Sequence, residues 1–66
     1  MKTFYVGQTV YCVRFVGQLK VVWVVDKKNK LTKTNNENEI KYLICSTKEE
    51  TTVQVNLDEV ILPEEM

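Results

Sequence analysis

Residues 21–25 read Val-Val-Trp-Val-Val and form the longest apolar run of this 66-residue chain. Valine is β-branched, which lowers its helix propensity and suits it to the pleated surface of a sheet. We predict a β-strand over residues 19–26, which contain this run. Both faces of this strand are apolar, so both need cover. A single small domain has one interior, which buries only one of the two faces.

Four further segments combine β-branched or aromatic residues with turn-forming neighbours, which predicts strands at residues 9–16, 40–45, 51–57 and 60–62. The pattern of residues 51–57 alternates, with Val53, Val55 and Leu57 on one face and polar residues on the other. No stretch of eleven residues repeats apolar positions at helical spacing while avoiding β-branched residues, so the chain is predicted to be all-β.

The segments between these strands carry turn and loop signals. Gly17-Gln18 suits a hairpin or sharp bend, and turns are expected at residues 27–30 and 46–50. Residues 34–39 are polar and asparagine-rich, which predicts a mobile loop. Asp58 is expected to cap a short 3-10 turn before the last strand. Pro63 is expected to end that strand and to leave a frayed acidic end.

The length predicts a single domain spanning residues 1–66. Five short strands at this spacing bury their faces only if the sheet curls, and closure into a barrel also removes exposed strand edges. On strand 9–16 the two faces are apolar as well, with Tyr11, Val13 and Phe15 on one side and Val10, Cys12 and Val16 on the other. Intramolecular cover by residues 1–6, a second copy of the chain and a separate partner are three ways to shield the surplus apolar face.

Two segments resemble the ends of small SH3-like barrels, including KOW-like and Tudor-like modules. Residues 6–11 (VGQTVY) resemble the glycine turn that leads into the first barrel strand, and residues 57–63 (LDEVILP) resemble the short turn and closing strand. Residues 39–44 (EIKYLI) resemble a strand in short proteins of phages and bacterial mobile elements. The resemblance implies a five-stranded SH3-like barrel with a 3-10 turn before the last strand, and a phage-type protein. It implies little about function, because this fold hosts unrelated functions.

Charge is distributed unevenly along the chain, although the net charge is zero. Residues 1–33 hold seven lysine or arginine residues and one acidic residue, whereas residues 34–66 hold two lysines and eight acidic residues. Such asymmetry marks either an interaction surface or strands from the two halves that interleave and neutralise each other. We expect the second arrangement.

The usual catalytic and metal-binding signals are missing from the sequence. The chain contains no histidine, the commonest general base and a frequent zinc ligand. Cys12 and Cys45 stand alone, without a CxxC pair, and adjacent glutamates fall in expected turns and tails. No phosphate-binding glycine loop is present. We therefore expect a non-enzyme with no catalytic residue, no metal site and no cofactor.

Compartment is inferred from the cysteines and from the first residues. Gly7-Gln8-Thr9 interrupts the initial apolar residues before a secretory signal forms, and residues 21–25 are far too short to span a membrane. These features favour a cytoplasmic protein whose two cysteines are reduced and buried, although a disulfide stays open as the alternative.

Three hypotheses about function follow, in order of preference. The first is a protein-binding module, for instance a phage-encoded modulator of a host protein, because aromatic residues dominate interface hot spots. The second is a self-associating structural protein or homodimer. The third is a single-stranded nucleic-acid-binding module, which zero net charge and a single arginine disfavour. The candidate partner-binding residues are Tyr5, Tyr11, Phe15, Trp23, Lys27, Lys28 and Lys30.

Overall fold

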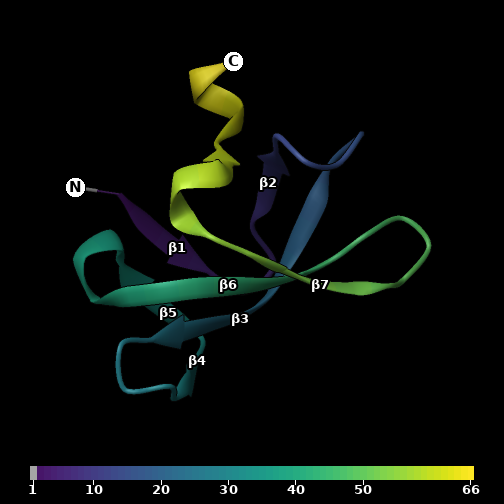
Figure 1. Cartoon of the computed structure of the whole chain (residues 1–66). Helices are drawn as coiled ribbons and strands as arrows, with labels where there is room; N and C mark the ends of the chain where they lie inside the picture. The colour runs from purple at the N-terminus through teal and green to yellow at the C-terminus, as the bar shows by residue number, and fades with distance from the viewer. Residues whose placement is uncertain (1) are drawn as a thin grey trace.

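The computed structural model describes residues 2–66, and they form an all-β structure (Figure 1). The strands are β1 (Thr3–Tyr5), β2 (Thr9–Cys12), β3 (Leu19–Asp26), β4 (Leu31–Thr32), β5 (Thr34–Asn36), β6 (Ile40–Ser46), β7 (Thr52–Val55) and β8 (Val60–Ile61). Three 3-10 turns accompany them: η1 (Glu37–Glu39), η2 (Leu57–Glu59) and η3 (Pro63–Glu65).

The main sheet is antiparallel and curled into a half-barrel. Its strands pair in the order β7-β6-β3-β2-β8, and β4 pairs with the far end of β3. The last strand in the chain, β8, thus pairs with β2, the first strand of this sheet in chain order, and Tyr11 lies opposite Ile61. Strands β7 and β8 are the two edge strands of this sheet. They do not pair with each other, so the barrel is not closed between them.

A second, two-stranded sheet forms where the sequence predicted no strand. Strand β1 pairs with β5 in antiparallel register, with Phe4 opposite Asn35. Residues 34–39 were expected to be a mobile loop; they instead form β5 and the turn η1, which the Asn36 side chain caps by accepting from the Asn38 amide. The expectation was wrong because an asparagine-rich segment becomes a strand once a partner supplies its hydrogen bonds.

The core lies on the concave side of the curled sheet and contains only apolar side chains and the two cysteines among its fully buried members. It is formed by Phe4, Val10, Cys12, Leu19, Val21, Val24, Ile40, Leu43, Cys45, Val55 and Leu62. Of the expected cover by residues 1–6, Met1 lies outside the described residues and Phe4 is buried in this core. Phe4 therefore covers the inner side of the sheet.

The strand predicted over residues 9–16 ends at Cys12, because the chain then leaves the sheet in a turn. Val10 and Cys12 point into the core, while Val13 and Val16 are exposed. The loop is held by two backbone bonds, from the Val13 amide to the Glu59 carbonyl at 3.3 Å and from the Phe15 amide to the Cys12 carbonyl at 3.1 Å. Of the predicted second apolar face, only Tyr11 lies within the strand, because Val13 and Phe15 belong to the loop.

The C-terminal expectations need two corrections. A 3-10 turn does precede the last strand, but Asn56 is its N-cap residue and Asp58 lies inside it. Residues 63–65 form η3, which is held to the N-terminal segment by a 2.7 Å ion pair between Lys2 and Glu65. The Leu62 amide also donates to the Glu65 carboxylate at 2.9 Å. A frayed end was predicted because this long-range pair cannot be read from local sequence.

Candidate functional site: an outer apolar face and a basic turn

The convex side of the sheet carries an apolar surface that the core does not use. Residue pairing across three strands places Trp23 opposite Ile44, and Val25 opposite both Tyr42 and Leu31. We call these five residues the outer apolar face. Cross-strand neighbours on one face of an antiparallel sheet lie within side-chain contact distance, so the five side chains form one surface.

Two irregularities in the pairing of β3 with β6 create this surface. The register shifts between Val21 and Trp23, which makes Val22 an extra residue in β3. As a result Val21 and Val24 both face the core, and Trp23 and Val25 face outward. A bulge of this kind turns the following side chains to the other face of the sheet.

The second shift makes Lys41 an extra residue in β6. Simple alternation places Ile40, Tyr42 and Ile44 on one face, but this pattern is broken by the bulge at Lys41. Ile40 belongs to the core, whereas Tyr42 and Ile44 lie on the outer face and are half-buried. Tyr42, Ile44 and Leu31 were not among the sequence candidates, because their shared face depends on pairing between strands.

The degree of exposure differs across the outer apolar face. Val25 is buried although it is not part of the core cluster, because Tyr42 and Leu31 flank it on the neighbouring strands and Trp23 lies two residues before it. Trp23 is half-buried, and 56% of Leu31 is exposed. The outer apolar face thus has the buried Val25 at its centre and partly exposed large side chains around it. A partner that covers these side chains would remove them further from water.

The outer apolar face continues into a basic turn, residues 27–30, which joins β3 to β4. The Asp26 carboxylate shapes this turn by accepting from the amides of Lys28 at 2.8 Å and Lys30 at 2.9 Å. These backbone bonds, that of Lys30 first, lower the pKa of Asp26 below its ordinary value. Asn29 adopts the left-handed conformation with φ of 65°, and Lys41 donates to its side chain at 2.8 Å.

Among residues 2–66 no lysine side chain of the basic turn forms an ion pair. Within residues 2–66 there are two ion pairs, Lys2–Glu65 and Arg14–Glu59. Both join the two halves of the chain, so part of the expected neutralisation occurs. Lys27, Lys28 and Lys30 remain exposed, and the Asp26 carboxylate at the base of the turn interacts electrostatically with Lys28 and Lys30. In Figure 1 the β3–β4 hairpin that carries them lies at the bottom and the acidic C-terminal turn at the top.

The structure does not bring all the sequence candidates together. Trp23 lies on the outer apolar face, and the three candidate lysines lie in the adjoining turn. Tyr11 is half-buried opposite Ile61 of β8. Phe15 packs against the core, with the Arg14 guanidinium 5.2 Å from its ring centre.

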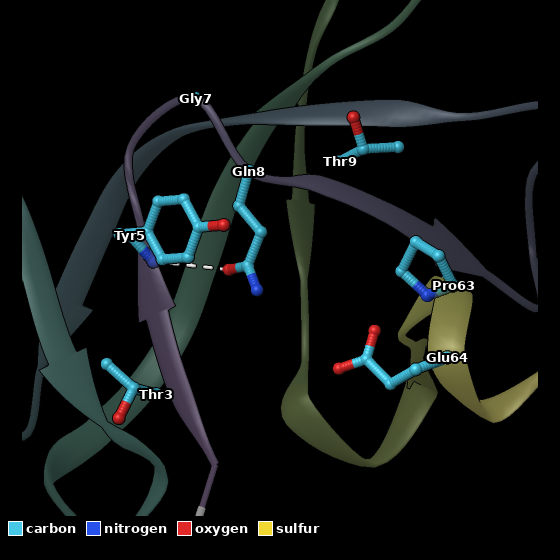
Figure 2. A pocket seen from close by; sticks show the side chains of 7 residues that line it. All are labelled: Thr3, Tyr5, Gly7, Gln8, Thr9, Pro63 and Glu64. Atoms are coloured by element: carbon cyan, nitrogen blue, oxygen red, sulfur yellow. Dashed lines mark hydrogen bonds between the residues drawn. The ribbon is translucent and has the colours of Figure 1, made fainter.

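Tyr5 lies elsewhere, in an open cleft of about 480 Å³ between β1, the following turn and η3 (Figure 2). Its side chain is one of four polar ones on the strand and turn side, with Thr3, Gln8 and Thr9, and the opposite wall is formed by Pro63 and Glu64. This cleft is separate from the outer apolar face and has a different, polar character.

Other chemistry is sparse in the described part of the chain. Cys12 and Cys45 are free and buried, and burial, with a smaller effect from Cys12, raises the pKa of the Cys45 thiol to about 11. A thiol with so high a pKa is a poor nucleophile. Among residues 2–66 no three His, Cys, Asp or Glu side chains are placed to hold a metal ion. No helix in the same range is long and apolar enough to cross a membrane.

Comparisons with protein-family models, with curated proteins and with solved structures found no match for this chain.

Proposed function

We propose that this protein is a small non-enzymatic binding module that docks an acidic segment of a partner protein onto the outer apolar face and the basic turn. The observation that carries the proposal is the continuity of the two surfaces. Leu31, which is 56% exposed, directly follows Lys30 and lies beside Val25 on the outer apolar face. Apolar anchors and exposed lysines therefore meet at one place.

The chemistry of the surface favours this kind of partner. Tryptophan and tyrosine are enriched among residues that dominate binding energy, and Trp23 and Tyr42 lie on neighbouring strands. The lysines attract an acidic chain and fix its orientation, a contribution that acts mainly on the association rate. A segment that carries one large apolar side chain followed by carboxylates would satisfy both parts.

We further propose an SH3-like architecture for the module. Support comes from the order of the main sheet, in which four strands pair in sequence order and the last strand, after a 3-10 turn, pairs with the first. The setting we propose for such a module is the cytoplasm, on the basis of its cysteines and first residues. Its role there as a phage-encoded modulator of a host protein rests on the sequence resemblance. Genes of a phage early region beside the coding sequence would support it, whereas a structural operon would contradict it.

Single-stranded nucleic acid is one rival occupant, because bases stack on aromatic side chains beside lysines. We favour a protein because the outer apolar face includes three aliphatic residues, Val25, Leu31 and Ile44, which offer no stacking surface. Acidic residues also balance the basic ones over the whole chain. A nucleic-acid-binding domain generally carries a net positive charge.

The test uses variants of one exposed residue and one charge cluster. Partners are captured on the immobilised protein, identified, purified and measured by calorimetry. Leu31→Asp and the triple variant Lys27→Glu, Lys28→Glu, Lys30→Glu should each weaken binding at least about tenfold. Val16→Ser, at a fully exposed side chain of the β2–β3 loop, and Lys48→Glu, after β6, serve as controls and should leave binding unchanged.

Three outcomes would contradict the proposal. The first is a purified partner whose affinity is the same for all four variants. The second is micromolar binding of a single-stranded oligonucleotide that the triple variant abolishes. The third is sedimentation as a dimer that Leu31→Asp converts to a monomer, which would assign the outer apolar face to a second copy. Circular dichroism of each variant establishes that it is folded.

A further inference from the structure

The cleft beside Tyr5 has the form of a binding site independent of the outer apolar face. Its volume of about 480 Å³ falls within the range typical of small-ligand sites. In Figure 2 the Tyr5 ring extends from β1 on one side, and the Glu64 carboxylate extends toward it from η3 on the other. Tyr5 is 51% exposed, so its ring is available to a ligand.

The polar groups of the cleft are partly oriented by the backbone. The Tyr5 amide donates to Oε1 of Gln8 at 3.2 Å, which fixes that end of the side chain. Thr3 and Thr9 add hydroxyl groups from β1 and β2. The lining combines hydroxyl acceptors, one carboxylate and one aromatic ring, and none of the described lining residues is basic.

The electrostatics around the cleft favour a cation. Lys2 is held by Glu65 at 2.7 Å, and this bond is the main cause of its raised pKa, with smaller contributions from the charges of Glu37 and Glu64. The Lys2 ammonium is therefore bonded to one carboxylate and interacts electrostatically with two more. Glu64 itself forms no salt bridge among residues 2–66, and it lines the cleft.

We propose that this cleft binds the guanidinium group of an arginine side chain presented by a peptide. A guanidinium is planar, so it stacks on the face of the Tyr5 ring while its N–H groups donate to the Glu64 carboxylate. Carboxylate and guanidinium pair through parallel, charge-assisted hydrogen bonds.

Other ligand classes fit the lining less well. A phosphate or carboxylate would meet Glu64 without a basic lining residue to balance it. An apolar ligand would leave the hydroxyl and amide groups without hydrogen-bond partners, which costs free energy. A lysine ammonium would satisfy the charge but offers no planar surface to the Tyr5 ring.

The test is an NMR titration with Nα-acetyl-arginine amide, against the citrulline analogue, which has nearly the same shape and no charge. The arginine compound should shift the amide signals of Tyr5, Gln8, Thr9 and Glu64 with a Kd in the millimolar range. Citrulline should bind at least about tenfold more weakly, because the charge-assisted bonds to Glu64 are lost.

Variants test whether arginine binds in the cleft beside Tyr5. Glu64→Gln should weaken arginine binding at least about tenfold, and Tyr5→Ala should weaken it severalfold. Glu49→Gln, a matched change in the β6–β7 turn, should have no effect. Equal shifts with citrulline, shifts spread over other surfaces, no shifts at all, or unchanged binding to Glu64→Gln would each overturn the proposal. None of these outcomes bears on the outer apolar face.

Discussion

Arg14 and Glu59 form an ion pair across the side of the half-barrel where β7 and β8 do not pair with each other. The same guanidinium donates through Nη2 to the Gln54 carbonyl of β7 at 2.7 Å. Arg14 belongs to the β2–β3 loop, so one side chain joins three separate segments. An unpaired strand edge is a site for unwanted association, and a charged side chain bound along it blocks that association.

The Arg14–Glu59 interaction should therefore be measurable as coupling between the two residues. In a double-mutant cycle of Arg14→Met and Glu59→Gln, we expect a coupling free energy of about 1 kcal/mol, the upper range for a partly exposed pair. Urea denaturation of the four proteins provides the values. Additive effects would mean that the pair contributes nothing.

The division between core and outer apolar face predicts opposite consequences for two leucines. Leu43 is fully buried, and Leu43→Ala should lower the free energy of unfolding by about 2–5 kcal/mol, because it leaves a cavity. Leu31→Ala should change it by no more than about 0.5 kcal/mol, because the side chain is mostly exposed. Urea denaturation tests both; similar losses would mean that Leu31 also belongs to a core.

The buried thiol of Cys45 should make the protein less stable at high pH. Its pKa is about 11 in the folded protein and 9.0 without burial, so the folded state favours the protonated thiol. The resulting stability is fully present below pH 9.0 and is lost as the pH rises toward about 11. The urea midpoint of wild type should fall over this interval more than that of Cys45→Ala, which has no thiol at this position; parallel curves would contradict the prediction.

The same burial should protect both cysteines from alkylation. Iodoacetamide at neutral pH should label neither Cys12 nor Cys45 in the folded protein and both after unfolding in urea, as measured by mass spectrometry. Rapid labelling of Cys45 in the folded state would show that the thiol is accessible.

Asp26 should stabilise the basic turn in a pH-dependent way. Its pKa is lowered in the folded protein, mainly by the amide of Lys30, so the ionised form contributes stability above the ordinary value of 3.8. This contribution is lost as the pH falls through the lowered pKa. Asp26→Asn should therefore be less stable than wild type at neutral pH, and the difference should shrink in acid.

Glu50 has a backbone conformation that glycine adopts more easily. Its φ of 62° lies in the left-handed region, where a Cβ atom costs about 1 kcal/mol. Glu50→Gly should raise the free energy of unfolding by up to that amount. Gly7→Ala, at φ of 92°, should lower it by about the same amount, although an added Cβ would meet no atom within 4 Å. Changes of the same sign in the two variants would rule out backbone strain as their cause.

The sequence by itself determined the all-β class and the positions of the strands that carry most of the fold. The strand predicted at residues 19–26 has the same bounds as β3, and the alternation of Val53, Val55 and Leu57 predicts the side of β7 and η2 that packs on the core. These features are local, because β-branched density and alternation act within a few residues.

Only the tertiary structure decided which apolar residues remain outside the core. The bulges at Val22 and Lys41 arise from the pairing of β3 with β6, and they bring Trp23, Tyr42 and Leu31 to one face from three strands. Likewise Thr3 lies opposite Asn36 because β1 meets a segment some thirty residues away. Register and long-range pairing depend on contacts between distant residues, so local sequence patterns do not contain them.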